Sequence, residues 1–395
     1  MNTASKSRVQ SLIASFKEMF PGAGGAICVS RAPGRVNLIG EHTDYNEGFV
    51  MPGAIALDTY AACSTNDSCH LSVRSLQQAE SVRFPLNDPE PKPRRDWTDY
   101  VRGVLIELLR MGYAIGGADL LIDGRVPMNA GLSSSAALEV ASALALLHAT
   151  GSTLGAGDLA RLCQWAENNF VGARCGIMDQ FCSVSGTTGH AILLDCRSLQ
   201  AKCVPVPQSL QIVTCNTMVK HSIAAGEYNQ RRAECEECVK YFKSEQLHIN
   251  SLRDLSERDL ERHGSGLPEV LFRRCRHVIT ENSRVLRAAD ALESNDLETV
   301  ATLMYESHAS LRDDYEVSCA ELDLMVDLAK NLPGVHGSRM TGGGFGGCTV
   351  SLVEGRAVEE FKNEMAGRYE RARGIRPEIY GTTLVEGARI LEKMR

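Results

Sequence analysis

The sequence lacks a basic excess, a long apolar run and an apolar leader. Its 395 residues include 49 acidic and 42 basic side chains, a net charge of −7. No block of lysine or arginine stands out, so we expect no binding to nucleic acid or to a membrane surface. The longest apolar stretch of helical character, Ala136–Ala149, is too short to cross a bilayer and contains Glu139. Residues Met1–Arg8 precede no apolar core, which argues against a secretory signal. A soluble, cytoplasmic protein is expected.

Paired cysteine motifs are also scarce, although the chain has 14 cysteines. They are scattered, and Cys28, Cys63 and Cys348 lie in apolar or strand-like contexts. This placement predicts reduced core thiols rather than a disulfide framework. Cys235 and Cys238 form one CxxC in a charged helical stretch, with neither a second CxxC nor an HxxxH. We therefore expect neither zinc nor redox chemistry there.

The length of 395 residues fits two domains with ample core. Helical and strand-like apolar patterns interleave without an internal repeat, which predicts an α+β fold with a soft domain boundary near 200–210. In the first half we expect helices at 5–20, 97–111, 136–148 and 157–170, strands at 26–30, 57–64, 71–76 and 118–122, and a hairpin made by 182–185 and 190–194. In the second half we expect a strand at 210–215, helices at 225–243, 257–262, 269–292, 295–311, 319–331 and 356–372, and strands at 337–340, 348–353 and 377–382.

Residues 34–45 crowd five polar or ionisable side chains into ten positions, namely Arg35, Asn37, Glu41, His42 and Asp44. A strand that ends in glycine can turn sharply and present the side chains that follow it to a cleft. Two carboxylates and a histidine then offer several acceptors and one switchable donor, which suits a ligand with many hydroxyl groups. The alternative interpretation of this stretch is an ordinary charged surface loop.

A second stretch, Asn129–Ser135, reads Asn-Ala-Gly-Leu-Ser-Ser-Ser directly before a run of strong helix formers. Unpaired N–H groups at a helix N-terminus bind phosphate, Gly131 allows close backbone approach, and serine hydroxyls can reach phosphate or magnesium. Simple N-capping of the helix is the alternative, but a cap needs only one serine. The stretch therefore predicts a phosphate loop.

A third stretch, Gly342–Gly347, holds five glycines in six residues. It fits G-x-G-x-x-G, but it lacks the acidic residue and the βαβ context of a dinucleotide fold. The chain also lacks a Walker A lysine motif, so any nucleotide is held in another way. So many glycines cost too much entropy for a plain turn. We expect a close backbone approach to a ligand or to the other glycine loop.

Asp179 lies on an apolar stretch after Gly176-Ile177-Met178, where burying a carboxylate is costly without a partner. A structural cap or salt bridge would explain it, but Arg35 is available as a partner and would make a catalytic pair. Glu167, on the preceding helix, could add a hard oxygen ligand for magnesium.

These motifs together resemble those of the galactokinases, within the GHMP small-molecule kinase superfamily. Gly34–Tyr45 matches the galactokinase signature, Gly131–Ala136 (GLSSSA) the superfamily phosphate loop, and Ser338–Gly347 (SRMTGGGFGG) the third motif. Further similar segments are Cys175–Phe181, Gly226–Arg232 and Glu306–Ser318. The resemblance runs in order from about residue 28 to residue 353 and covers most of the chain.

The resemblance implies ATP-dependent phosphorylation of the C1 hydroxyl of α-D-galactose, as in galactose catabolism by the Leloir pathway. It implies a two-domain GHMP kinase fold with the active site in the cleft between the domains. We expect the domains at 1–205 and 206–395, and a monomeric enzyme. The implied catalytic residues are Asp179, as the base, and Arg35. The implied sugar contacts are Arg35, Glu41, His42, Asp44, Gly176, Asp179 and Tyr228. The implied ATP contacts are Asn129, Ala130, Gly131, Leu132, Ser133, Ser134, Ser135 and Trp97, with Ser135 and Glu167 as the Mg²⁺ ligands.

Several alternatives stay open at this point. The chain could be a sugar-1-kinase for N-acetylgalactosamine, arabinose or galacturonate, a catalytically inactive sugar and ATP sensor, or another GHMP kinase such as a mevalonate or homoserine kinase. The intact serine loop, Arg35 and Asp179 argue against the sensor. Asn129 stands where the family's loop usually has glycine, which puts nucleotide affinity in question. Whether Asp179 is a true base or an electrostatic aid is also open.

Overall fold

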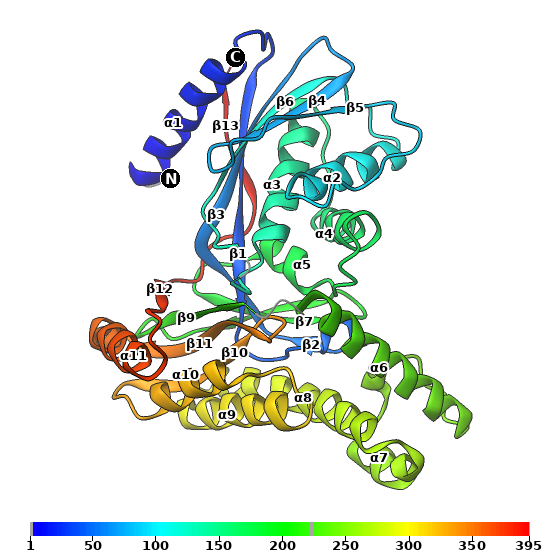
Figure 1. Cartoon of the computed structure of the whole chain (residues 1–395), viewed down its shortest axis with the longest axis vertical. Helices are drawn as coiled ribbons and strands as arrows, with labels where there is room; N and C mark the ends of the chain where they lie inside the picture. The colour runs from blue at the N-terminus through cyan, green and yellow to red at the C-terminus, as the bar shows by residue number, and fades with distance from the viewer. Residues whose placement is uncertain (1–2, 129, 221–223, 395) are drawn as a thin grey trace.

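The structure is a computed structural model that describes residues 3–128, 130–220 and 224–394. Helices and strands interleave along the chain, as expected for an α+β protein (Figure 1). A large sheet and its helices form one end of the molecule, and smaller sheets with a group of long helices form the other. Asn129 lies outside the described residues. No helix within the described residues is long and apolar enough to cross a membrane.

The large sheet has six strands in the order β13-β1-β3-β6-β4-β5. Neighbouring strands are antiparallel except for the pair β4 and β6, which is parallel. The strands are β1 (Ile27–Asn37), β3 (Pro52–Thr65), β4 (His70–Ser75), β5 (Val82–Pro85), β6 (Ala118–Gly124) and β13 (Arg389–Met394). Because β13 pairs with β1, the two ends of the chain lie at the same end of the molecule (Figure 1).

Alternate side chains of this sheet face two separate cores. Ile27 and Val29 of β1 pack with α1 (Thr3–Met19), whereas Cys28 packs with the helices on the opposite face. Those helices are α2 (Thr98–Arg110), α3 (Ser134–Ala149) and α4 (Ala156–Trp165). Every residue of β1 is buried, and successive side chains face opposite cores, as in a strand that is covered on both faces.

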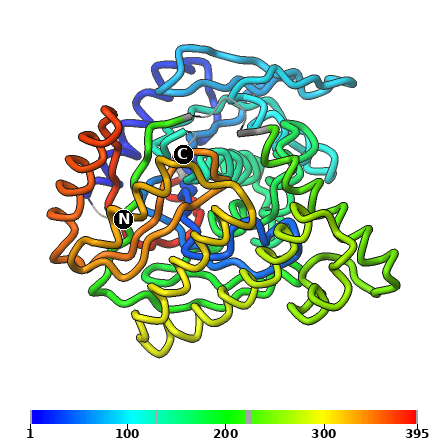
Figure 2. Tube along the Cα trace, turned by 60° about the horizontal axis from the view of Figure 1, so that its bottom comes forward, coloured from blue at the N-terminus to red at the C-terminus, as the bar shows by residue number. Residues whose placement is uncertain are grey.

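The other end of the molecule contains the four-stranded sheet β10-β11-β9-β12 and the small sheet β2-β7-β8. These strands are β2 (Phe49–Val50), β7 (His190–Asp195), β8 (Ala201–Pro205), β9 (Leu210–Lys220), β10 (Val335–Thr341), β11 (Gly346–Glu354) and β12 (Glu378–Thr382). The helices are α6 (Ala224–Ser244), α7 (Glu257–His263), α8 (Glu269–Glu293), α9 (Leu297–Asp313), α10 (Ala320–Lys330) and α11 (Val358–Arg373). In Figure 2, where this end of the molecule is turned forward, the yellow helices lie along its lower side and the red helix α11 lies at the left.

The predicted hairpin at 182–185 and 190–194 is wrong in its first arm. Residues Met178–Ser185 form the helix α5, and only the second arm is a strand, β7. Met178, Phe181 and Cys182 recur at helical spacing on the buried side of α5. The strands β2, β5, β8 and β13 were not predicted. The division of the chain at residue 205 stays a prediction.

Candidate active site

Two cavities adjoin at the N-terminus of α3. The larger has a volume of about 990 Å³, and Trp97 and Met128 are among its lining residues. The smaller, of about 280 Å³, is lined from both halves of the chain. Its lining includes Arg35, Glu41, His42, Asp44, Gly131, Leu132, Ser133, Asp179, Tyr228, Gly342 and Gly343. Tyr100, Ser134 and Ser135 line both cavities, so the predicted phosphate loop lies where the two meet.

Arg35 and Asp179 form the predicted pair. The Nε of Arg35 donates to Oδ1 of Asp179 at 2.7 Å, and its Nη2 lies 2.6 Å from the same oxygen. The third guanidinium nitrogen, Nη1, donates to the carbonyl of Gly131 at 2.7 Å. Arg35 is 4% exposed, so the ion pair lies at the floor of the small cavity. The arginine thereby ties the strand β1 both to α5 and to the phosphate loop.

Ser133 donates its hydroxyl to the other oxygen of Asp179, Oδ2, at 2.5 Å. The residue precedes the first turn of α3 with φ of 59°, in the left-handed region. Its hydroxyl thus reaches the carboxylate instead of capping the helix, against the simpler explanation of the serine run. Both oxygens of Asp179 are held, one by a cation and one by a hydroxyl.

Asp44, His42 and Tyr228 line the same cavity. Burial, with a further contribution from the nearby Asp179, raises the pKa of Asp44 to about 6. Burial also holds the pKa of His42 well below its usual value, so this ring is neutral at physiological pH. His42 has φ of 63°, a strained conformation for a residue with a side chain. The ring of Tyr228 lies 5.5 Å from that of His42, centroid to centroid.

Gly176 supports Asp44 from the opposite side. A Cβ atom at residue 176 would overlap the Asp44 carboxylate, so only glycine fits against it. Gly176 and Asp44 line an adjoining cavity of about 300 Å³. Gly176 does not line the small cavity, but it leaves the space that the Asp44 carboxylate occupies there.

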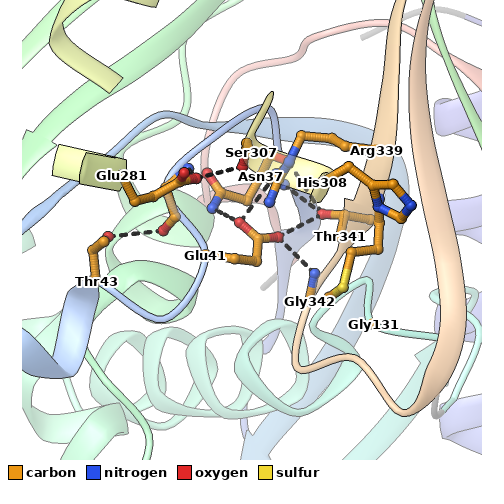
Figure 3. Close-up of polar contacts among 12 residues, drawn as sticks. Asn37, Glu41, Thr43, Gly131, Glu281, Ser307, His308, Arg339, Thr341 and Gly342 are labelled. Carbon is orange, nitrogen blue, oxygen red and sulfur yellow. Dashed lines mark hydrogen bonds and ion pairs between the residues drawn. The ribbon is translucent and has the colours of Figure 1, made fainter. Parts of the chain in front are cut away.

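Glu41 is held by partners on three sides (Figure 3). Its Oε1 accepts from the N–H of Gly342 at 2.7 Å and from Thr341 Oγ1 at 3.0 Å. Its Oε2 accepts from Arg339 Nη1 at 3.2 Å and from the side-chain amide of Asn37. These four bonds use the acceptor capacity of a carboxylate. A ligand hydroxyl that reached Glu41 would have to replace one of them.

The two glycine loops lie backbone against backbone, as predicted. A Cβ at Gly131 would come 3.1 Å from the carbonyl oxygen of Thr341, and one at Gly342 would come 3.0 Å from Cα of Gly131. Both glycines also have positive φ, 70° and 84°. Side chains at either position would separate the loops, so the glycines bring the phosphate loop to the loop that Glu41 holds.

Ser135 and Glu167 lie together behind the phosphate loop. The hydroxyl of Ser135 hydrogen-bonds to Glu167, and Nε2 of Gln180 donates to Oε2 of Glu167 at 2.6 Å. Burial, with the charge of Asp179, raises the pKa of Glu167 to about 7. Within the described residues, no lysine, arginine or histidine pairs with this carboxylate. Glu167 lies in a π-helical segment, Ala166–Val171, a feature that often marks functional sites.

Trp97 lines the large cavity. Its indole Nε1 is buried and has no hydrogen-bond partner among the described residues. Gly343, Tyr100 and Cys175 line the small cavity as well and were not among the predicted site residues. Gly343 lies in the predicted glycine cluster, which could have suggested it. Tyr100 belongs to an apolar helical stripe, so no local signal distinguished it.

The prediction that most of the cysteines are core thiols is confirmed, because nine of the 14 are buried. All 14 are free thiols. Cys235 and Cys238 are buried, and no group of three or more potential metal ligands occurs among residues 3–128, 130–220 and 224–394. Cys238 instead donates to the carbonyl of Leu271 at 3.5 Å.

Three family models match the chain in succession. They are the galactokinase galactose-binding signature at residues 14–65, the GHMP kinases N terminal domain at 99–187, and the GHMP kinases C terminal domain at 288–371. The first contains the polar loop around Glu41, and the second contains the phosphate loop and Asp179. The matches therefore fall on the elements that build the two cavities.

Comparison with individual known proteins points to the same family as the family models. The chain is 49% identical to the galactokinase of Chloroflexus aggregans, over 86% of this chain and 87% of that protein. It is 46% identical to the galactokinase of Roseiflexus sp., over 93% and 94%. The solved structure of Lactococcus lactis galactokinase complexed with galactose superposes with a TM-score of 0.93 at 35% identity, covering 97% of this chain and all of that one. The chain is therefore a kinase with the GHMP kinase fold, and it belongs to the galactokinase family.

Proposed function

We propose that this protein transfers the γ-phosphoryl group of ATP to the C1 hydroxyl of α-D-galactose, giving galactose 1-phosphate and ADP. The observation that carries the proposal is the Arg35–Asp179 pair in the small cavity, beside the phosphate loop. The small cavity would hold the sugar and the large cavity the nucleotide. The phosphate-loop serines that line both would then lie along the path of the transferred group.

Asp179 would take the proton of the C1 hydroxyl as that oxygen forms its bond to the γ-phosphorus. The bond between this phosphorus and the bridging oxygen of ATP breaks, and ADP leaves. Arg35 orients the carboxylate through Oδ1 and Ser133 through Oδ2, so the base is positioned before substrate binds. The guanidinium also offers positive charge to the transferring group.

The sugar contacts are proposed from the same geometry. Asp44, in its ionised form, would accept hydrogen bonds from sugar hydroxyls, with Gly176 fixing its position. His42 would offer the sugar a polar ring edge, and Tyr228 would offer it an aromatic ring face. Glu41 would hold the loop at Gly342. Its carboxylate could accept a hydrogen bond from the sugar only by losing one of the four that it now accepts.

The nucleotide phosphates would lie against Ala130–Ser135 and the N-terminus of α3, whose N–H groups carry positive potential. Asn129, proposed as part of this loop, lies outside the described residues. Trp97, which lines the large cavity, would contact the adenine.

Ser135 and Glu167 fit a magnesium site. Their donors are oxygen atoms, which Mg²⁺ prefers, and Glu167 is a buried carboxylate that no cation in the described chain compensates. Bound Mg²⁺ would neutralise charge on the ATP phosphates.

We also propose that the enzyme is monomeric and cytoplasmic, with domains at 1–205 and 206–395.

The test is ADP release with galactose, N-acetylgalactosamine, arabinose, galacturonate, glucose or no sugar, with the product identified by phosphorus NMR. Galactose-dependent release of ADP and of a sugar phosphorylated at C1 is expected. A preference for another sugar would favour the related sugar-1-kinase. Binding of galactose and ATP without ADP release would favour the inactive sensor.

A further inference from the structure

The segment of residues 40–49 carries side chains that line the small cavity, among them His42 and Asp44. Its regular structure consists of one 3₁₀ turn, Asp44–Asn46, and the first residue of β2. The backbone is in the left-handed region at Gly40 and at His42, with φ of 102° and 63°. For a residue with a side chain this conformation is costly and persists only where its surroundings enforce it. The contacts that hold the segment therefore determine where its side chains point.

Helix α8 holds the start of this segment. Oε1 of Glu281 accepts from the backbone N–H of Gly40 at 2.9 Å. Val285, on the next turn of α8, packs against the same glycine, because a Cβ at residue 40 would come 2.9 Å from its Cγ2. Nε2 of His277 lies 3.1 Å from the carbonyl oxygen of Glu41, which can only accept, so the ring donates there. Two backbone groups of neighbouring residues thus bind α8.

The same helix holds the end of the segment. Oδ1 of Asn282 accepts from the backbone N–H of Phe49 at 2.8 Å. The amide nitrogen of Asn282 donates to the carbonyl of Val278 at 3.0 Å, so each end of the amide faces the partner that suits it. Gly48 lies against the same oxygen, because a Cβ at residue 48 would overlap it. Two adjacent residues of one helix therefore bind both ends of the segment.

Glu281 is itself fixed by an ion pair and a hydroxyl. Its Oε2 accepts from Nε of Arg284 at 2.7 Å, and its Oε1 also accepts from the hydroxyl of Ser307 on α9 at 2.6 Å (Figure 3). Glu281 is completely buried and Arg284 is 8% exposed. Burial would raise the pKa of Glu281, but the charge of Arg284 and further donors outweigh it and lower the pKa to about 2. A buried ion pair adds little net stability compared with apolar residues of similar size, so stability alone does not explain this carboxylate.

We propose that Glu281 and Asn282 are positioning residues that anchor the 40–49 segment at both ends and so hold His42 and Asp44 toward the sugar. They act through the backbone of the segment, and neither is among the residues that line the small cavity. The sugar-facing part of this inference rests on the proposed function. The anchoring does not, because it is a property of the protein without ligands.

The direct test is amide hydrogen exchange of the whole protein, followed by mass spectrometry of its peptides, without sugar or ATP. Asn282→Ala removes the acceptor of the Phe49 N–H. Glu281→Gln places an amide where a carboxylate accepts from both Arg284 and Gly40, and an amide has only one accepting end. In each variant we expect peptides that cover residues 40–49 to exchange roughly 5- to 10-fold faster than in the wild type.

Each variant has a matched control. The side chain of Asn331, at the end of α10, donates to the carbonyl of Asp327 four residues earlier, as Asn282 does to Val278, so Asn331→Ala removes the same bond within a helix. Glu107 is a buried glutamate of α2 whose partner, Arg110, lies on the same helix, so Glu107→Gln removes a buried carboxylate elsewhere. Both controls should leave the exchange of residues 40–49 as in the wild type.

The functional test measures galactose affinity by calorimetric titration, together with kcat and the KM for ATP. A loosened segment presents its side chains correctly for only part of the time, and the apparent affinity falls by that fraction. We expect Asn282→Ala and Glu281→Gln to bind galactose roughly 3- to 10-fold more weakly than their controls. The kcat at saturating galactose and the KM for ATP should change little, because bound sugar restores the segment. A merely structural role would lower the unfolding temperature and leave galactose affinity unchanged.

Unchanged exchange of residues 40–49 in Asn282→Ala would overturn the proposal. Galactose affinity equal to that of the controls would also overturn it, since the segment would then face the sugar without α8. If Glu281→Gln did not fold, Asn282→Ala would decide alone. If the wild type neither bound nor phosphorylated galactose, the proposed function would fall, while the exchange result would still decide whether α8 anchors the segment.

Discussion

Arg35 and Asp179 lie 144 residues apart in the sequence, and the arginine binds Oδ1 of the carboxylate through two of its nitrogens, at 2.6 and 2.7 Å. Their elements, β1 and α5, come together only in the folded chain. Because Arg35 also donates to the carbonyl of Gly131, one side chain aligns the proposed base with the phosphate loop. The proposed chemistry depends on this alignment.

Replacing Arg35 by alanine should lower kcat more than it raises the galactose KM. The change removes positive charge near the transferring group and releases both Asp179 and the Gly131 carbonyl, and effects of this kind cost about 10²- to 10³-fold in rate. Arg35→Lys keeps the charge without the planar fork and should recover only part of the rate. Steady-state kinetics checks this. A pure KM effect would contradict the role given to Arg35.

Gly176→Ala should weaken galactose binding with little change in kcat. The new methyl group would overlap the carboxylate of Asp44 and displace it from the cavity. Gly157→Ala is the matched control, because a Cβ there meets no atom within 4 Å and residue 157 lies in the helix α4. Calorimetric titration with galactose checks the prediction. Equal affinity in the two variants would show that Asp44 does not bind the sugar.

The affinity for galactose should fall as the pH drops through about 6. The pKa of Asp44 is raised to about 6 by burial and by Asp179, so below this pH its carboxylate takes up a proton and loses its capacity to accept. The measurement is galactose titration without ATP, because Glu167 titrates near 7 in the region proposed for Mg²⁺. Asp44→Asn should bind weakly at every pH. An Asp44→Asn variant that kept the wild-type pH profile would exclude Asp44 as its source.

Asp44 should also make the protein less stable at neutral pH. Its pKa is about 6 in the folded state against 3.8 in the unfolded state, so folding takes up a proton between these values. The destabilisation is complete above about pH 6 and disappears toward pH 4. Asp44→Asn should therefore raise the unfolding temperature at pH 8, by an amount equivalent to at most about 3 kcal/mol, and less at pH 5. Thermal unfolding at the two pH values measures the difference. An equal gain at both would contradict the assignment.

Much of this architecture could be predicted from local pattern. Glu41, His42 and Asp44 follow one another in sequence, so their arrival at one cavity was predictable, and the five glycines of 342–347 indicated a close backbone approach. The ion pair of Asp179 was predicted because a carboxylate on an apolar stretch needs a partner, and Arg35 was available. These inferences needed only residue chemistry and spacing.

The remainder depended on contacts between distant residues. The hydroxyl of Ser133 binds Asp179, 46 residues away, whereas the local pattern equally allowed a helix cap. Thr341 and Arg339 hold Glu41 from about 300 residues away. The strand β13 alternates charged and apolar residues too weakly to be recognised alone, and it is defined by pairing with β1.

The most direct test of the account is galactose-dependent ADP release by Asp179→Asn, measured with galactose binding on the same sample. Asparagine preserves the shape of the side chain but cannot take the C1 proton, so turnover should fall by about 10²- to 10⁴-fold while galactose still binds. Asp158→Asn, at an exposed aspartate of α4, should match the wild type. Near-normal turnover by Asp179→Asn would contradict the assignment of Asp179 as the base.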